Sequence, residues 1–173
     1  MRKVTVLSSA SGNGKTTVGR DLAARLDVRF VELDVLVHGP DWTETPDAEL
    51  VAILEPILAA DSWVIDGDYS SKVGNLVLEQ ADTVVWLDLP IHVWLPRLLR
   101  RTVRRIARCE ELWNGNRESV RGAVWGKDAL IPFALRMHRQ RRRTYPARLA
   151  AYPTVRLRTQ AEVDRFLSDA GAP

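Results

Sequence analysis

The stretch SSASGNGKTT, from Ser8 to Thr17, decides the fold of this chain. It follows an apolar run, Val4 to Leu7, that alternates like a β-strand, and it precedes a segment with the apolar period of a helix. It closes with Gly-Lys-Thr, the end of the pattern G-x-x-x-x-G-K-[ST], which wraps backbone N–H groups around phosphate oxygens. Ser9 stands where that pattern has its first glycine.

The loop is therefore predicted to bind the phosphates of a nucleotide. Glycines at two positions let N–H groups turn inward where a side chain would collide, and the following helix adds its positive end. Lys15 is expected to reach the β- and γ-phosphates, and Thr16 to ligate Mg²⁺ through its hydroxyl. The expected nucleotide-binding residues are Ser9, Ala10, Ser11, Gly12, Asn13, Gly14, Lys15, Thr16 and Thr17.

Ser9 is the departure from the pattern. A serine is disfavoured at this position if the backbone there needs a positive φ. The position begins the loop rather than lining its centre, so serine is tolerated if φ stays negative. The alternative interpretation is a strand-to-helix turn that carries an exposed lysine.

Length and composition indicate one globular domain. The 173 residues are 46% hydrophobic and 27% charged, which is ordinary for a soluble protein. No uninterrupted apolar stretch approaches the roughly 18 residues of a membrane helix, and the N-terminus lacks the layout of a signal peptide. The single cysteine, Cys109, cannot form an internal disulfide, which fits a reducing compartment. We therefore expect a soluble, cytoplasmic protein without a membrane partner, as a monomer or homodimer.

The charge is distributed unevenly. Residues 1–96 carry a net charge of −8 and residues 97–173 a net charge of +11, and 21 of the 25 basic residues are arginine. Arginine suits bidentate contacts with phosphate. The basic half therefore indicates a polyanionic ligand, either a nucleotide or a nucleic acid.

Five short apolar segments alternate with helical patterns. The predicted strands are residues 3–8, 28–33, 62–65, 83–87 and 155–158, and the predicted helices are residues 15–26, 46–60, 91–108, 132–151 and 160–170. This alternation predicts an α/β domain with a parallel sheet. Asp34, Asp66 and Asp88 fall at ends of predicted strands, as the phosphate loop does, and such sheets bind ligands at that edge.

Several runs together resemble one kinase superfamily. KTTVGRDLAARLDVRFVELD (residues 15–34) looks like the opening of nucleoside monophosphate kinases and shikimate kinases. ELDVL, WVIDGDYS, ADTVVWLDLP and the tail YPARLAAY resemble the adenylate-kinase-like proteins often labelled topology modulation proteins. The resemblance implies a three-layer P-loop NTPase fold of the adenylate and shikimate kinase type, with a five-stranded parallel sheet, bound ATP and a helical, arginine-rich lid.

The resemblance also divides the single expected domain. Its core would comprise residues 1–33, 61–96 and 145–173, its acceptor-binding insertion about residues 34–60, and its lid about residues 97–144. Two departures bear on the acceptor. The adenylate kinase signature D-G-F-P-R is here Asp66-Gly67-Asp68-Tyr69-Ser70, without its arginine, which argues against AMP. The Gly-Gly-Gly run of shikimate kinases after the third strand is also missing, which argues against shikimate.

Five acidic and aromatic positions are candidates for metal or acceptor binding. Asp66 is expected to hold Mg²⁺ through water, and Asp34 to accept a proton from an acceptor hydroxyl or to orient it. The alternative for each is a capped turn. Trp42 and Tyr69, with Asp68, are expected to bind the acceptor, the rings by stacking on a base or ring. For these rings, partial burial without a ligand is the alternative.

The basic helix of residues 91–108 is expected to serve the lid. Arg97, Arg101, Arg104 and Arg108 share one face, and Leu95, Leu99, Val103 and Ile106 are expected to anchor another. The candidates for contact with the transferring phosphate are Arg97, Arg101 and Arg105, with Arg139, Arg142 and Arg143 from a second cluster. The loop ELWNGNRE, residues 111–118, is the expected lid tip. No histidine has the spacing of a metal ligand.

Three functions are compatible with these patterns. The leading one is a kinase that depends on ATP and Mg²⁺ and phosphorylates a small acceptor, a nucleotide or nucleoside. The second keeps this chemistry with a hydroxylated metabolite as acceptor, in the manner of shikimate and gluconate kinases. The third is an arginine-rich nucleic-acid-binding protein with a regulatory nucleotide site, against which stands the lack of a recognised nucleic-acid motif.

Overall fold

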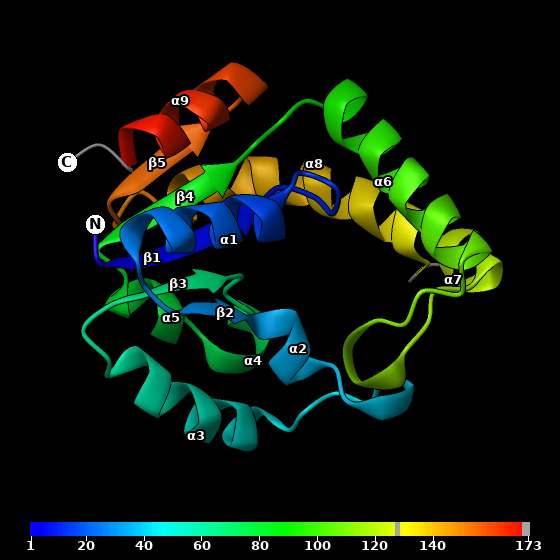
Figure 1. Ribbon diagram of the computed structural model, residues 1–173, viewed down its shortest axis with the longest axis horizontal. Helices are drawn as coiled ribbons and strands as arrows, with labels where there is room; N and C mark the ends of the chain where they lie inside the picture. The colour runs from blue at the N-terminus through cyan, green and yellow to red at the C-terminus, as the bar shows by residue number, and fades with distance from the viewer. Residues whose placement is uncertain (127–128, 171–173) are drawn as a thin grey trace.

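A parallel sheet of five strands lies at the centre of the computed structural model, which describes residues 1–126 and 129–170 (Figure 1). The strands follow the order β2-β3-β1-β4-β5. Their bounds are β1 (Lys3–Ser8), β2 (Phe30–Glu32), β3 (Trp63–Asp66), β4 (Thr83–Leu87) and β5 (Thr154–Leu157). All four pairings are parallel, which confirms the predicted α/β class.

Helices cover both faces of the sheet (Figure 1). They are α1 (Lys15–Leu26), α2 (Leu33–Val37), α3 (Asp47–Leu58), α4 (Ser70–Val73), α5 (Leu76–Gln80), α6 (Ile91–Ala107), α7 (Val120–Val124), α8 (Leu130–Arg148) and α9 (Gln160–Ala170), with 3-10 turns η1 (Pro40–Trp42) and η2 (Trp113–Gly115). On one face α1 and α9 bury a cluster with β1, β3 and β4. On the other face, one cluster joins β2 and β3 to α2–α5, and a second joins β1 and β4 to α5 and α8. The expected three layers are thus confirmed.

The main elements follow the predicted bounds closely, and the short ones were missed. β1, β4, α1 and α9 span the residues predicted for them. α2, α4, α5 and α7 have only four or five residues, too few for an apolar period to be visible in sequence. α2 corrects the position of Asp34, which lies in the first turn of this helix and not at a strand end.

The buried face of α6 differs from the one predicted. Its buried residues are Trp94, Leu98 and Thr102, whereas Leu99 is 41% and Val103 66% exposed. The prediction that Leu99 and Val103 anchor this helix is therefore wrong. The reason is that α6 packs directly on the phosphate loop. A β-carbon at position 12 would lie 2.7 Å from the Trp94 carbonyl oxygen. The packing of α6 therefore requires glycine at position 12, in addition to the shape of the loop.

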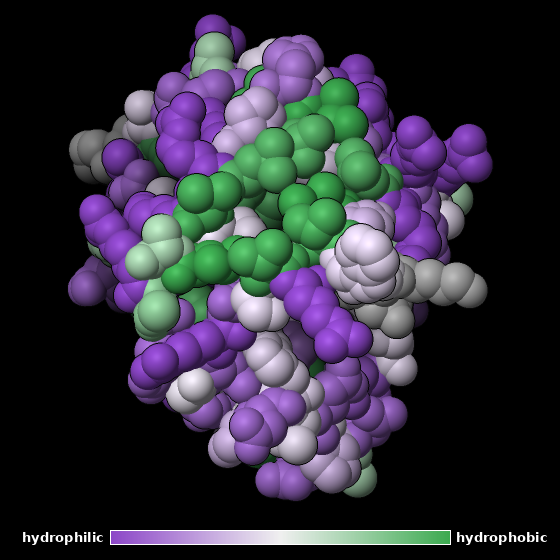
Figure 2. All heavy atoms as spheres, turned by 90° about the vertical axis from the view of Figure 1, so that its right-hand side faces the viewer, coloured by the Kyte–Doolittle hydropathy of each residue, from purple (hydrophilic) through white to green (hydrophobic). Residues whose placement is uncertain are grey.

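An apolar patch lies on the outer face of the lid segments (Figure 2). It includes the exposed side chains Leu99 and Val103 of α6 and Val120 and Val124 of α7. Among the helices of the described ranges, none has the length and apolar character needed to cross a bilayer. Lys127 and Asp128, within the expected lid, lie outside the described residues.

Ser9 is held in a buried polar network at the sheet edge. Its φ is not positive, so the condition for tolerating serine is met. Its hydroxyl donates to Asp88 at 2.7 Å and accepts from the Trp86 indole at 2.9 Å. Asp88 also binds Arg156 at 2.5 Å, and Arg156 lies over the Trp86 ring. A glycine could make no such contact, so serine here ties the start of the loop to the ends of β4 and β5.

Replacing Ser9 by alanine is expected to destabilise the fold. The change leaves a buried carboxylate and a buried indole N–H each with one partner fewer, at a cost of about 1–3 kcal/mol in the free energy of unfolding. Denaturant titration measures it. Ser11→Ala is the matched control, because the Ser11 hydroxyl has no hydrogen bond within the described residues, and its effect should stay within about 0.5 kcal/mol. Equal effects of the two variants would contradict the network.

Candidate active site

The loop between β1 and α1 is preshaped for phosphate. Gly12 has φ 88° and Gly14 has φ 86°, a conformation that side chains disfavour. Gly14 caps the N-terminus of α1, so N–H groups of the first turn face the loop. The buried side chain of Asn13 donates to the Ala10 carbonyl at 2.9 Å and accepts from the Leu89 N–H at 3.1 Å. The cradle therefore exists before any ligand arrives.

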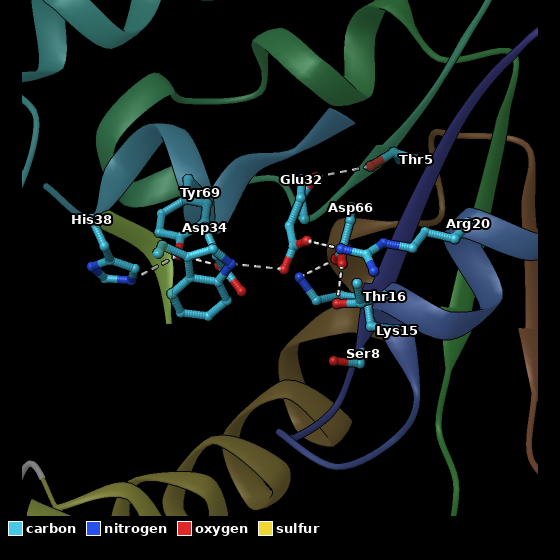
Figure 3. A network of polar contacts seen from close by, with 12 residues as sticks. Thr5, Ser8, Lys15, Thr16, Arg20, Glu32, Asp34, His38, Asp66 and Tyr69 are labelled. Atoms are coloured by element: carbon cyan, nitrogen blue, oxygen red, sulfur yellow. Dashed lines mark hydrogen bonds and ion pairs between the residues drawn. The ribbon is translucent and has the colours of Figure 1, made fainter. Parts of the chain in front are cut away.

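Asp66 lies beside this loop because β3 pairs with β1. Its carboxylate forms an ion pair with Lys15 and accepts a hydrogen bond from the Thr16 hydroxyl at 2.6 Å (Figure 3). Burial raises the pKa of Asp66, and Lys15 and Thr16 act in the opposite direction. The residues chosen from sequence for the lysine and metal roles are thus brought together.

No group of three or more His, Cys, Asp or Glu side chains within the described residues could hold a metal ion. A divalent cation at this loop would therefore depend on phosphate oxygens in addition to protein groups. Thr16 and Asp66 supply a hydroxyl and a carboxylate at adjacent positions, which are the ligand types that Mg²⁺ prefers.

Asp34 and Tyr69 contact each other in the part of the cleft that lies beyond the phosphate loop. The Tyr69 hydroxyl donates to Asp34 and lies 3.2 Å from Nε2 of His38 (Figure 3). Burial, then the Asp34 charge, raises the pKa of Tyr69, so this phenol stays protonated and acts as a donor. Asp34 has no ion pair within the described part of the chain. It is therefore a carboxylate available to a ligand.

One further residue, Glu32, was missed from the sequence. Glu32, at the end of β2, is buried and accepts hydrogen bonds from Arg20 at 3.0 Å and from the Trp113 indole at 3.2 Å. It thereby draws the lid tip towards Asp34. Sequence patterns gave no signal for this pairing, because Glu32 and Trp113 are separated by 81 residues.

Four rings gather at this end of the cleft. His38 stacks on Trp113 at 5.9 Å between ring centroids and meets Trp42 at 5.7 Å and Tyr69 at 6.3 Å edge to face. Trp42 and Trp113 lie 6.5 Å apart. Trp42, Asp68 and Tyr69 all line the cleft, as expected of acceptor-binding residues.

Residues 38–44 and 111–117, from the expected acceptor loop and lid tip, have the same backbone structure and pack against each other. Residues 38–44 and 111–117 are each closed by an isolated antiparallel bridge. In each loop the N–H of the second residue donates to the carbonyl of the sixth at 2.7 Å, and the fourth residue, Asp41 or Asn114, has a positive φ of 54° or 55°. Two loops from distant parts of the sequence thus form one cap over the cleft.

Asn116 locks these two loops together. Its buried amide accepts from the Trp42 N–H at 2.8 Å and donates to the Gly39 carbonyl at 2.9 Å and the Trp113 carbonyl at 2.8 Å. Asn114 adds a bond to the His38 carbonyl at 2.5 Å. Because Asn116 fixes the backbone of both tryptophans, it sets the position of the ring cluster.

The arginines divide into those that reach the cleft and those that do not. Arg97, Arg101 and Arg105 line it, and their contact with a transferring phosphate stays a prediction. Arg139 and Arg143 instead line a separate hollow of about 480 Å³ on α8, and Arg142 is paired with Asp88 at 3.2 Å. Arg141 and Arg148, which were not among the candidates, line the cleft from α8. Successive arginines of α8 lie on different faces of the helix, and composition alone does not indicate which of them face the cleft.

Arg101 differs from the other arginines of the cleft. Arg105 is paired with Glu118 at 2.8 Å and Arg148 with Asp68 at 2.6 Å. Arg101 has no ion pair or hydrogen bond within the described residues, although its side chain is largely buried. Burial lowers its pKa, but a guanidinium stays charged. An unpaired buried cation in a cleft is poised for an anionic ligand.

The phosphate loop, Asp34, Tyr69 and Arg101 line one cleft of about 1930 Å³. A pocket for one drug-sized ligand measures about 300–1000 Å³. The cleft is therefore large enough for a nucleotide at the phosphate loop and a second molecule beside Asp34.

Removing the Asn116 amide is expected to loosen the cap. Asn116→Ala takes away three hydrogen bonds, and we expect amide hydrogen exchange in residues 38–44 and 111–117 to become at least about tenfold faster. Asn116→Asp keeps the acceptor for the Trp42 N–H and should have a smaller effect. Unchanged exchange in Asn116→Ala would show that the amide does not hold the two loops together.

No protein-family model matches the chain. Among curated proteins, a shikimate kinase from Sulfurihydrogenibium sp. is 29% identical over 101 residues, or 50% of this chain. A shikimate kinase from Rippkaea orientalis is 25% identical over 114 residues, or 58% of this chain. The matched regions span 61% of the length of each relative.

Solved structures match nearly the whole chain. A shikimate kinase from Acinetobacter baumannii in complex with shikimate has a TM-score of 0.60 at 20% identity, covering 98% of this chain and 90% of its own. A gluconokinase from Sinorhizobium meliloti gives 0.55 at 19% identity, covering 98% and 89%. A deoxyadenosine kinase from M. mycoides with bound dATP gives 0.57 at 11% identity, covering 98% and 99%.

At these identities the structural likeness shows the fold, which is the fold expected from sequence. The narrower likeness to topology modulation proteins stays a prediction. The phosphate loop, the five-stranded parallel sheet and the similarity to curated shikimate kinases agree on a P-loop kinase fold.

Proposed function

We propose that the protein is a phosphotransferase that depends on ATP and Mg²⁺ and phosphorylates a hydroxyl group of a small molecule, a nucleotide or nucleoside. One observation carries this proposal: a phosphate loop and an unpaired carboxylate, Asp34, line the same cleft, with an unpaired arginine, Arg101, between the lid and the loop. A protein that only bound a nucleotide would have no use for the second compartment.

The nucleotide end fits ATP and its metal. The loop from Ser9 to Thr17 would enclose the phosphates, with Lys15 exchanging Asp66 for phosphate oxygens. Thr16 and Asp66 would hold Mg²⁺, Asp66 through water. When bound, the metal neutralises charge on the β- and γ-phosphates.

The acceptor end supplies the proton acceptor. The hydroxyl oxygen of the acceptor forms a bond to the γ-phosphorus, the bond from phosphorus to the β-phosphate oxygen breaks, and its electrons leave with ADP. The hydroxyl proton passes to Asp34, which Tyr69 holds in place. Arg101 stabilises negative charge on the transferring group, and Arg97 and Arg105 are further candidates from the same helix.

The second candidate is a kinase of a hydroxylated metabolite. The similarity of this chain to curated shikimate kinases, and to solved structures of a shikimate kinase and a gluconokinase, favours it. The two candidates share every step at the nucleotide end and differ only in what lies beside Asp34. A nucleic-acid ligand is disfavoured, because the sequence carries no recognised nucleic-acid-binding motif.

Lys15→Ala is expected to abolish the binding of Mg-ATP in isothermal calorimetry, because the change removes the cation that contacts the β- and γ-phosphates. Lys3→Ala, at the opposite end of β1, is the matched control and should bind Mg-ATP as the native chain does. Native-like affinity of Lys15→Ala would refute the assignment of the phosphate loop.

Arg101→Ala is expected to slow catalysis without weakening nucleotide binding. Loss of one group that stabilises transition-state charge costs about 10²–10³ in rate. The slow hydrolysis of ATP, in which water is the acceptor, provides the readout alongside the affinity for Mg-ATP. Arg100→Ala, on the exposed side of α6, should change neither quantity. Equal rates for the two variants would remove Arg101 from the catalytic set.

A further inference from the structure

We propose that the acceptor is an uncharged ring compound with a free hydroxyl group, which is the chemistry of a nucleoside, and not a nucleoside monophosphate or a ring or sugar acid. This inference rests on the proposed function and defines the ligand of its second compartment. It depends on how charges are paired around Asp34 and on the rings that form the wall.

The basic side chains at the acceptor end are already neutralised by the protein itself. Lys72 binds Glu44 at 3.1 Å and Asp47 at 2.9 Å. Arg148 binds Asp68 at 2.6 Å. An acceptor that carries a carboxylate or phosphate would have to displace one of these protein carboxylates. Because the fold already holds each of them beside its cation, such displacement is unfavourable.

Further towards the lid, the same pairing holds. Arg105 is bound by Glu118 at 2.8 Å, and Arg117 lies 3.8 Å from Glu111. Three lining arginines have no carboxylate partner within the described residues: Arg97 donates to Gln160 at 3.0 Å, Arg141 donates to the Ser8 carbonyl at the start of the phosphate loop at 3.0 Å, and Arg101 has neither an ion pair nor a hydrogen bond. The proposed function places Arg101 at the transferring phosphate. The cations at the acceptor end, Lys72 and Arg148, are therefore already paired with carboxylates.

Both signs of charge are disfavoured on the acceptor. The unpaired carboxylate of Asp34 would repel an anionic group, and Glu32 is buried close to it on the same wall. A cationic acceptor would face Arg101 from α6. A compartment with this balance of charges favours a neutral molecule.

The walls favour a flat ring. Trp42 and Trp113 meet edge to face at 86°, with His38 and Tyr69 completing the cluster beside Asp34. Trp42 is 44% exposed although the Asn116 lock fixes its backbone, so its ring has free surface in the cleft. Aromatic pairs of this kind take up planar rings by stacking, and Asp34 provides an acceptor for a hydroxyl proton.

Matched pairs of ligands test the inference by binding. Thymidine and cytidine are titrated against their 5′-monophosphates and against shikimate, with Mg²⁺ and a saturating non-hydrolysable ATP analogue occupying the nucleotide end. Quenching of tryptophan fluorescence and calorimetry are the readouts. We expect each nucleoside to bind at least about tenfold more tightly than its monophosphate and than shikimate, because the cations at the acceptor end are already paired. Equal or tighter binding of the anions, or no binding of any nucleoside, would overturn the inference.

One substitution should shift this preference. Asp68→Asn removes the carboxylate that neutralises Arg148, and we expect the ratio of monophosphate to nucleoside affinity to rise at least about tenfold. Asp61→Asn, in the exposed turn before β3, is the control and should leave the ratio unchanged. An unchanged ratio in Asp68→Asn would contradict the role of charge pairing.

The outcomes separate the inference from the proposed function. Tight binding of a monophosphate or of shikimate beside a bound ATP analogue would leave a kinase with a different acceptor. Loss of nucleoside selectivity in Trp42→Ala, with unchanged binding of the ATP analogue, would locate the ring contact in the acceptor compartment. Unchanged selectivity in that variant would count against the ring wall.

Discussion

The ion pair between Lys15 and Asp66 is the interaction on which the rest of the site depends. It joins the loop after β1 to the end of β3, and it exists because these strands are neighbours in the sheet. Asp66 is buried, so its charge needs Lys15, and removing either partner would leave the other uncompensated. In the proposed reaction, bound phosphates would give the lysine a new anionic partner and leave the carboxylate free to hold a metal ion through water. The same pair therefore stabilises the empty loop and responds to the ligand.

The nucleotide end was largely predictable from sequence. A local pattern sets it: nine consecutive residues, from the end of β1 into the first turn of α1, with glycines at the positions that need a positive φ. The parallel sheet then brings Asp66 to the loop, since all its strands end at one edge. Ser9, which departs from the loop pattern, is tolerated because its φ is not positive, as its place at the start of the loop indicated. Its hydrogen bond to Asp88 could not be predicted, because it depends on the pairing of β4 with β1.

The acceptor end was predictable only in part, because its contacts join distant segments. Asp34 and Tyr69 were identified, but Glu32 and Asn116 owe their roles to partners more than 70 residues away. The buried face of α6 was misjudged because helix periodicity does not reveal which neighbour it will meet. In the structure that neighbour is the phosphate loop, where Gly12 leaves room for Trp94 and Leu98. The same limit explains why Arg141 and Arg148, rather than Arg139 and Arg142, line the cleft.

The central claim is that a donor site and an acceptor site in one cleft perform phosphoryl transfer. Its most direct test is to incubate the purified chain with ATP labelled in the γ-phosphate, Mg²⁺ and a panel of nucleosides, nucleoside monophosphates, shikimate and gluconate, and to look for labelled acceptor. The account predicts a labelled product that requires Mg²⁺ and that disappears in Asp34→Asn while Mg-ATP binding persists. Binding of Mg-ATP without transfer to any acceptor of the panel would contradict it.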